Sequence, residues 1–191
     1  MSHFYAMLFR MRNIERWSLM RNMFSENLAE HSLEVAFIAH ALAVISNRRF
    51  GANYNAEKVA VAAMFHDAPE IITGDLPTPV KYCNPQIKAA YRQIEREAQD
   101  NLLALLPEDL CGEFTDIFEP DPALQPLIHA ADKIQALIKC NDEISLGNRE
   151  FAEAKKATEA TIREIDLPAV RVFLEEFLPS FSLPLDSQTK G

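Results

Sequence analysis

Glycine is scarce in this sequence, with 5 residues among 191. Turn-rich β architectures and phosphate-binding loops both rely on glycine, because its backbone reaches conformations that other residues avoid. Neither a GxGxxG motif nor a GxxxxGK(S/T) motif occurs anywhere in the chain. The sequence therefore gives no support to a dinucleotide-binding fold or to a P-loop protein.

Cysteine is also rare, and its 3 copies form no CxxC pair: Cys83, Cys111 and Cys140. An odd number of widely spaced cysteines favours free thiols in a reducing cytosol over a disulfide framework. The N-terminal segment is interrupted by charge and lacks the apolar core of a signal peptide. No uninterrupted apolar run reaches the ~18 residues that a membrane span needs. We therefore expect a cytoplasmic protein that has no membrane partner.

Basic residues are fewer than acidic residues in this sequence. The chain has 19 Lys and Arg residues against 28 Asp and Glu residues, a formal net charge of −9. Binding to a nucleic-acid polymer relies on clustered Lys and Arg, so we do not expect that class of function. An anionic small molecule is compatible with the sequence if a bound metal or a local arginine offsets the overall field.

The sequence does have helical patterning along most of its length. Apolar spacing, capping residues and prolines predict helices over 3–12, 28–45, 56–68, 85–106, 108–118, 122–147, 149–165 and 168–178. The helix over 28–45 is apolar on nearly every side and should be buried. Residues 13–27, 47–55 and 71–85 should be irregular connections. The interpretation is one all-α domain over 1–191 with six to eight helices, in which the last residues, 182–191, form a flexible tail.

Reactive side chains gather in the stretch MFHDAPE, Met64 to Glu70, at the end of an apolar run. It places His66 beside Asp67, with Glu70 three residues further on. Burying such groups is costly unless they are paired, hydrogen-bonded or bound to a metal. Pro69 should disturb the helix here, because proline lacks an N–H and restricts the residue before it.

Two further residues offer partners for this stretch. His31 lies early in the first buried helix, and Asp132 lies within the apolar face of the long helix over 122–147. Each has an ordinary structural explanation taken alone, such as a hydrogen bond to a neighbouring helix. Together with His66 and Asp67 they make a mixed nitrogen and oxygen ligand set. That set suits manganese, iron, cobalt or zinc better than magnesium or calcium.

The order of His, His-Asp and a distant Asp on an all-helical chain resembles the HD-domain phosphohydrolases. The strings RWSLMRN, NLAEHSLEVA, MFHDAPEIITGDLPTPVKY and ADKIQALIKC closely resemble the bacterial 5′-deoxynucleotidases of the YfbR type. The resemblance implies an all-α HD domain that forms a homodimer. It also implies hydrolysis of 2′-deoxyribonucleoside 5′-monophosphates to deoxynucleoside and phosphate. The cofactor would be cobalt, manganese or another divalent transition metal such as zinc, iron or copper.

The resemblance also assigns roles to individual residues. Glu70 would be the catalytic carboxylate that moves a proton between water and the leaving O5′, and Asp75 a further active-site acid. Arg16 would bind phosphate through its planar guanidinium, and Trp17 would form a flat wall that excludes a 2′-hydroxyl. Lys81 is expected to be a solvated loop lysine. The metal ligands would be His31, His66, Asp67 and Asp132.

Two alternatives stay open. One is an HD phosphohydrolase that acts on a nucleoside triphosphate or a cyclic nucleotide, which would share the metal site. The pair Arg16–Trp17 and the short chain favour a small monophosphate instead. The other is a non-catalytic helical module that binds a metal or a nucleotide. The presence of Glu70 argues against it, because binding alone needs no proton-transfer group.

Overall fold

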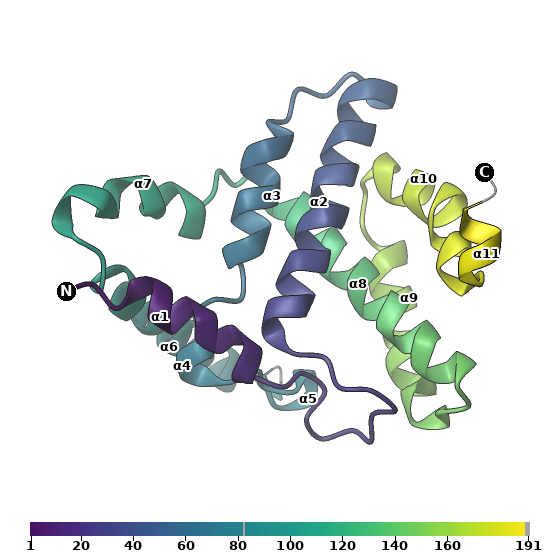
Figure 1. Ribbon diagram of the computed structural model, residues 1–191, viewed down its shortest axis with the longest axis horizontal. Coiled ribbons are helices and arrows are strands. Elements are labelled where there is room, and N and C mark those ends of the chain that lie inside the picture. Colours follow the sequence, from purple (N-terminus) through teal and green to yellow (C-terminus); the bar gives the residue numbers. More distant parts are fainter. Residues whose placement is uncertain (82, 190–191) are drawn as a thin grey trace. The chain divides into compact units, whose positions relative to one another are not determined.

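The computed structural model describes residues 1–81 and 83–189, and that part of the chain is helical with a single isolated β-bridge, between Glu15 and Asn27. Seven of its helices have nine residues or more, which confirms the predicted all-α class with six to eight helices. They are α2 (Leu28–Phe50), α3 (Ala56–Phe65), α6 (Pro85–Leu103), α7 (Glu108–Phe118), α8 (Gln125–Ser145), α9 (Ala152–Arg163) and α10 (Pro168–Glu176) (Figure 1). The shorter elements are α1 (Phe4–Leu8), α4 (Glu70–Thr73), α5 (Thr78–Lys81), α11 (Leu185–Gln188) and the 3-10 helices η1 (Phe9–Asn13), η2 (Arg149–Phe151) and η3 (Leu178–Ser182).

The chain divides into two compact units. The first comprises residues 1–34 and 61–121, and the second comprises residues 35–60 and the chain from 122 onward. Helices α2 and α3 contribute residues to both units. The single domain expected over 1–191 stays a prediction.

The core of the first unit surrounds the turn that follows α3. Helices α1 and α7 both pack on α6, and α1 lies beside α6 in Figure 1. Phe4 is fully buried, with its ring centroid 4.9 Å from that of Phe114, and Phe65 lies 5.6 Å from Phe118. Ala68 is buried in the same apolar cluster. Residues on both sides of His66 and Asp67 are therefore fixed by packing.

The second unit is organised around α8, which packs along α9. Its buried surface includes an ion pair in which Lys139 Nζ lies 2.6 Å from Glu143 Oε1. The other carboxylate oxygen of Glu143 accepts a hydrogen bond of 2.8 Å from Asn148 Nδ2, which ties the end of α8 to the following turn. A buried charge pair whose atoms are all satisfied specifies one arrangement of this turn.

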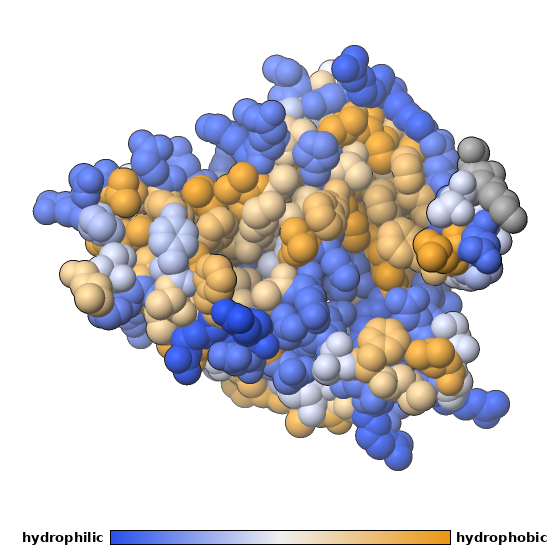
Figure 2. Space-filling model, in the orientation of Figure 1, coloured by the Kyte–Doolittle hydropathy of each residue, from blue (hydrophilic) through white to orange (hydrophobic). Residues whose placement is uncertain are grey.

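Helix α2 differs from the prediction in its length and its burial. It continues to Phe50, five residues past the expected end at Ile45. Leu33, Phe37 and Val44 are 46%, 65% and 38% exposed, so burial on nearly every side was wrong. The three residues fall on one stripe because their spacings of four and seven residues approximate whole turns. Figure 2 shows apolar side chains at the surface over α2.

Helix α2 is long enough to raise the question of whether it spans a membrane. By length and composition it could cross a membrane, since an 18-residue window has a mean hydropathy of 1.5. However, 56% of that window is buried inside the protein. A core helix gives the same pattern, so the hydropathy of α2 is weak evidence for a membrane span.

Prolines account for most of the other differences. Helix α3 ends at Phe65 instead of near Ala68, and Pro69 precedes a new short helix, α4. The expected loop over 71–85 contains α4 and α5, whose first turns follow Pro69 and Pro77. A proline suits the start of a helix because its fixed φ is helical and no N–H is needed there.

Two smaller differences lie at the start of α8 and in the C-terminal tail. Helix α8 begins at Gln125 instead of Pro122, and α11 lies within the expected tail. Residues 190–191 fall outside the described part of the chain, and the flexibility of the tail stays a prediction. The cysteines are free, as predicted.

Candidate active site

His31 is positioned by a capping box at the start of α2. The amide N–H groups of Ala29 and Glu30 donate to Asn27 Oδ1 at 3.0 and 3.1 Å, and Glu30 Oε2 accepts from Asn27 N at 3.2 Å. This reciprocal pattern fixes the first helical turn, as the sequence predicted. The side chain of His31 is fully buried within that turn.

His66 and Asp67 lie in a turn between α3 and α4, and not in a helix as predicted. The N–H of Ala68 donates to Phe65 O at 3.0 Å, and the N–H of Glu70 donates to Asp67 O at 2.9 Å. These bonds replace the helical pattern that Pro69 interrupts. The packing of Phe65 and Ala68 in the core then leaves both polar side chains directed away from it.

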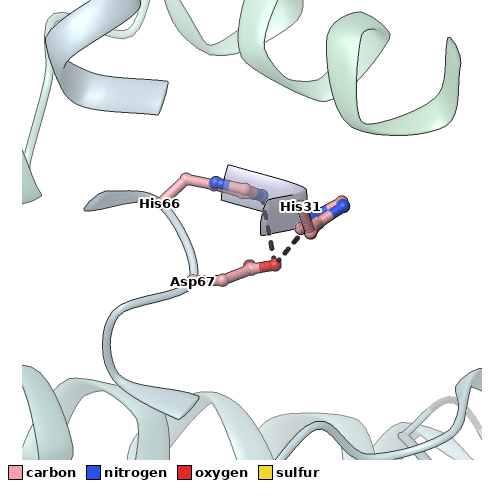
Figure 3. Close-up of side chains that lie close together, drawn as sticks. All are labelled: His31, His66 and Asp67. Carbon is pink, nitrogen blue, oxygen red and sulfur yellow. Dashed lines mark ion pairs between the residues drawn. The ribbon is translucent and has the colours of Figure 1, made fainter. Parts of the chain in front are cut away.

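Three side chains converge on one point (Figure 3). Asp67 Oδ2 lies 3.4 Å from His31 Nε2 and 3.1 Å from His66 Nε2. One potential ligand atom from each residue lies within 4.8 Å of the others. Two imidazoles and a carboxylate at this spacing are a suitable partial ligand set for a divalent transition metal.

Hydrogen bonding at His66 identifies which ring nitrogen would bind a cation. His66 Nδ1 lies 2.7 Å from Ala63 O, and a carbonyl oxygen only accepts, so Nδ1 carries the proton. When the ring is neutral, its lone pair is therefore on Nε2, which faces the Asp67 carboxylate. Within the described residues Nε2 is buried and makes no contact with hydrogen-bond geometry. A cation between His66 Nε2 and Asp67 Oδ2 would satisfy both of these acceptor atoms. The hydrogen bond from Nδ1 to a backbone carbonyl is typical of histidines that bind metals.

The charge state of Asp67 suits a ligand. Burial by itself would raise the pKa of its carboxyl, but the charge and hydrogen bonds of His66 and His31 in their protonated forms outweigh burial and lower the pKa well below its usual range. A carboxylate must be deprotonated to bind a metal.

Asp132, the fourth predicted ligand, lies on α8 in the second compact unit. Its carboxylate is partly buried, and Oδ2 accepts a hydrogen bond of 2.9 Å from Lys133 Nζ. Its role as a metal ligand stays a prediction.

Arg16 is fixed beside Asp67 by a residue that sequence reasoning missed. Arg16 Nε donates to Glu26 Oε1 at 2.8 Å, and its backbone N–H donates to Glu26 O at 2.9 Å. This leaves Arg16 Nη1 at 3.6 Å from Asp67 Oδ2 and 3.9 Å from Asp75 Oδ2. Glu26 also lies 3.9 Å from His31 Nδ1. The only sequence signal for Glu26 was its position directly before the capping Asn27.

Trp17 has φ 56°, the one positive φ at a non-glycine residue in the described chain. Its carbonyl oxygen accepts from Met20 N at 2.8 Å and from Asn22 Nδ2 at 3.2 Å. Such a conformation costs on the order of 1–3 kcal/mol and persists where the surroundings determine it. The strained residue is therefore Trp17 itself, for which the sequence resemblance predicted contact with the substrate.

Glu70 is the first residue of α4 and is 4% exposed. Burial, followed by repulsion from Asp67 and Asp75, raises the pKa of Glu70 to about 9, although Lys81 and Arg16 oppose the shift. The pKa of Asp75 is also raised by burial, with Arg16 opposing. A carboxylate with a raised pKa is a stronger base than an ordinary carboxylate and, once protonated, can donate that proton again.

This raised pKa predicts how the stability of the metal-free protein depends on pH. Glu70 binds a proton more tightly in the folded state, so its contribution to stability is lost as pH rises from its ordinary pKa of 4.5 to about 9. We expect the Tm of chelated wild-type protein to fall between pH 5 and pH 9 more steeply than that of Glu70→Gln. Thermal unfolding at pH 5, 7 and 9 measures the difference, and parallel profiles would contradict the raised pKa.

A cavity of about 260 Å³ opens at the metal-ligand cluster. Arg92 and Arg96 of α6 line this cavity, and the sequence patterns did not predict either residue at the site. Their one signal was an i, i+4 pair of arginines on α6. They bring positive charge to the site of a protein whose net charge is −9. The lining residues are His66, Asp67, Pro69, Glu70, Arg92, Glu95, Arg96 and Gln99.

A helical fold in which a buried His and a His-Asp turn converge on one point matches the HD-domain phosphohydrolase class that the sequence resembles. The fold resembles an HD-domain phosphohydrolase from Listeria innocua with a TM-score of 0.82, 25% identity and coverage of 94% of this chain and 88% of that chain. The chain belongs to the YfbR-like 5′-deoxynucleotidase family, whose model matches residues 3–181. It is 50% identical to a 5′-deoxynucleotidase of Vibrio cholerae and 51% identical to one of Vibrio vulnificus, each over 97% of both chains. The predicted family is confirmed.

Proposed function

We propose that this protein is a metal-dependent 5′-deoxynucleotidase that hydrolyses 2′-deoxyribonucleoside 5′-monophosphates to deoxynucleoside and phosphate. Family membership supports this reaction class, hydrolysis of a phosphoric monoester. The observation that carries the metal dependence is the approach of two imidazole Nε2 atoms to one oxygen of Asp67.

The metal would be bound by His31, His66 and Asp67, together with Asp132 as the family resemblance implies. When bound, a divalent metal supplies a Lewis acid for a phosphate oxygen and makes water a stronger nucleophile near neutral pH. Nitrogen ligands favour a divalent transition metal over magnesium and calcium. The family resemblance implies cobalt or manganese, with zinc, iron and copper as alternatives.

The remaining steps belong to side chains of the first unit. Arg16, oriented by Glu26, presents Nη1 toward Asp67 and Asp75, where it would bind the phosphate dianion. Glu70 lines the cavity and would accept the proton of the attacking water and deliver it to the leaving O5′. Asp75, held near Arg16, would orient the nucleophile or assist the leaving group.

Trp17 would select deoxyribose by leaving no room for a 2′-hydroxyl. We expect Trp17→Ala to lower the ratio of kcat/KM for dAMP to kcat/KM for AMP by about 10-fold or more. The smaller side chain would leave room for the 2′-hydroxyl of AMP, and changes in the size of one pocket have effects of this magnitude. Leu19→Ala, in the same segment and 75% exposed in the wild type, is the matched control. Steady-state phosphate release with both nucleotides measures the ratio. An unchanged ratio in Trp17→Ala would refute the proposal that Trp17 excludes a 2′-hydroxyl.

The proposal is tested by a phosphate-release screen across deoxynucleoside and ribonucleoside monophosphates, deoxynucleoside triphosphates and cyclic nucleotides, each with cobalt, manganese, zinc, iron and copper. The proposal expects turnover of the deoxynucleoside monophosphates above all others. Preferred hydrolysis of a triphosphate or cyclic substrate, or binding without turnover, would favour the alternatives. Sedimentation and cell fractionation test the homodimer and the cytoplasmic location that belong to the same proposal.

A further inference from the structure

We propose that Lys81 is a positioning residue that fixes the Glu70 carboxylate by tying α4 and α5 to Glu95 and Tyr91 of α6. This inference rests on the proposed function, because that function gives Glu70 its role. Lys81 would act through Glu70 and would not touch the substrate.

The contacts of Lys81 contradict the expectation of a solvated loop lysine. Its Nζ lies 2.7 Å from Glu95 Oε1 and 3.3 Å from Glu70 Oε1, and 4.7 Å from the centroid of the Tyr91 ring. The side chain of Lys81 is 21% exposed. One ammonium group therefore contacts two carboxylates and an aromatic face, which uses its donors and its charge together. The sequence hid this arrangement because the partners lie 11 and 14 residues away, beyond helical spacing.

Helix α4 needs such external support. It has four residues, Glu70–Thr73, and a helix this short is not stable by its own hydrogen bonds. At its end, Tyr91 Oη donates to Gly74 O at 3.3 Å and lies 3.2 Å from Thr73 Oγ1. Lys81 supplies the matching contact at the start of α4. The helix is thus attached to α6 at both ends, and Asp75 follows directly after the second attachment.

The two oxygens of Glu70 have different surroundings. Oε1 accepts a hydrogen bond from Lys81, whereas Oε2 is buried and has no hydrogen-bond partner among the described residues. Glu70 and Glu95 line the 260 Å³ cavity, and Lys81 is not one of its lining residues. Lys81 therefore holds the Glu70 carboxylate through Oε1 and leaves Oε2 as the oxygen for proton transfer. Without the ammonium group, repulsion from Asp67 and Asp75 would act on Glu70 with less to oppose it.

The primary test compares Lys81→Met and Lys81→Arg with wild type in the metal-loaded enzyme. We expect Lys81→Met to lower kcat by about 10- to 100-fold, the loss typical of a misplaced catalytic group, with KM for dAMP and metal content near wild type. Lys81→Arg keeps the charge and should recover part of the loss. Glu95→Gln weakens the same attachment with a smaller change and should lower kcat in the same direction. Lys156→Met is the control, because Lys156 makes an exposed ion pair of the same 2.7 Å length with Glu153.

A double-mutant cycle separates positioning from general destabilisation. If Lys81 acts through Glu70, Lys81→Met should cause no further loss of kcat when Glu70 is already glutamine. An undiminished loss in that background, or a wild-type kcat in Lys81→Met, would overturn the proposal. A large rise in KM alone would also overturn it, because that result would mean direct contact with substrate.

Failure of the proposed function would give a different pattern. A crystal structure of Lys81→Met should have the Glu70 carboxylate displaced, whatever the substrate of the enzyme. Displacement together with no phosphate release by wild type would reject the proposed function and keep the positioning role. Turnover by wild type, loss in Glu70→Gln and an unmoved Glu70 in Lys81→Met would keep the function and reject the positioning role.

Discussion

Replacing Glu70 with glutamine should lower kcat for phosphate release by about 10²- to 10⁴-fold and leave the bound metal in place. The amide is close in size to the carboxyl group but cannot take a proton from water and deliver it to O5′. Glu70 does not belong to the group of His31, His66 and Asp67 that offers metal-ligand atoms within 4.8 Å of one another. Metal content should therefore match wild type by elemental analysis.

The control for this prediction is Glu113→Gln, an exposed glutamate on α7. It should retain wild-type kcat and metal content. Wild-type turnover in Glu70→Gln would remove Glu70 from the mechanism and leave Asp75 as the remaining candidate for proton transfer. Loss of metal in Glu70→Gln would instead mean that the carboxylate supports the ligands and does not act on the reaction directly.

Replacing Asp67 with alanine should remove both the metal and the activity. The one oxygen Oδ2 lies 3.4 Å from His31 Nε2 and 3.1 Å from His66 Nε2, so the change deletes the atom on which the cluster converges. Without a metal, the Asp67 carboxylate is stabilised by the protonated forms of the two imidazoles, which lower its pKa despite burial, and a bound cation would take over that stabilisation. Two neutral imidazoles facing each other without an anion form a much weaker site for a divalent cation.

Elemental analysis after dialysis against limiting metal measures this effect in parallel with phosphate release. Asp116→Ala, an exposed position on α7, controls for the loss of one negative charge in the same unit. Full metal occupancy in Asp67→Ala would contradict the ligand assignment even if activity fell. Lower occupancy with normal activity would contradict the metal dependence itself.

Local chemistry made much of the fold predictable. The reciprocal bonds between Asn27 and Glu30 place His31 in the first turn of α2 as the capping pattern indicated. Asn84 also caps its helix, α6, by accepting a hydrogen bond of 2.8 Å from Ile87 N. Such contacts span three residues and can be recognised from the sequence alone.

The errors between Asp67 and Lys81 arose at prolines. Pro69 and Pro77 were interpreted as parts of a helix end and a loop, but each precedes a short helix. Proline excludes continuation of a helix and favours the start of one, and the sequence does not distinguish the two outcomes. The local path of the chain from Asp67 to Lys81 therefore needed the structure.

The site was predictable in its reactive residues and not in its supporting ones. His31, His66 and Asp67 were recognised by residue type and order, and they do converge. Glu26 and Lys81 were not recognised as supports, because their partners lie at 10 or more residues along the chain and their residue types are common at surfaces. Contacts of this kind depend on tertiary packing that spacing does not encode.

The most direct test of the account is phosphate release from dAMP by wild-type protein before and after removal of its metal. We predict that chelation and desalting abolish release and that cobalt or manganese restores it in proportion to the metal bound. We also predict that the restored enzyme has a higher kcat/KM for dAMP than for AMP. Undiminished release from dAMP by protein that elemental analysis finds free of metal would contradict the central claim.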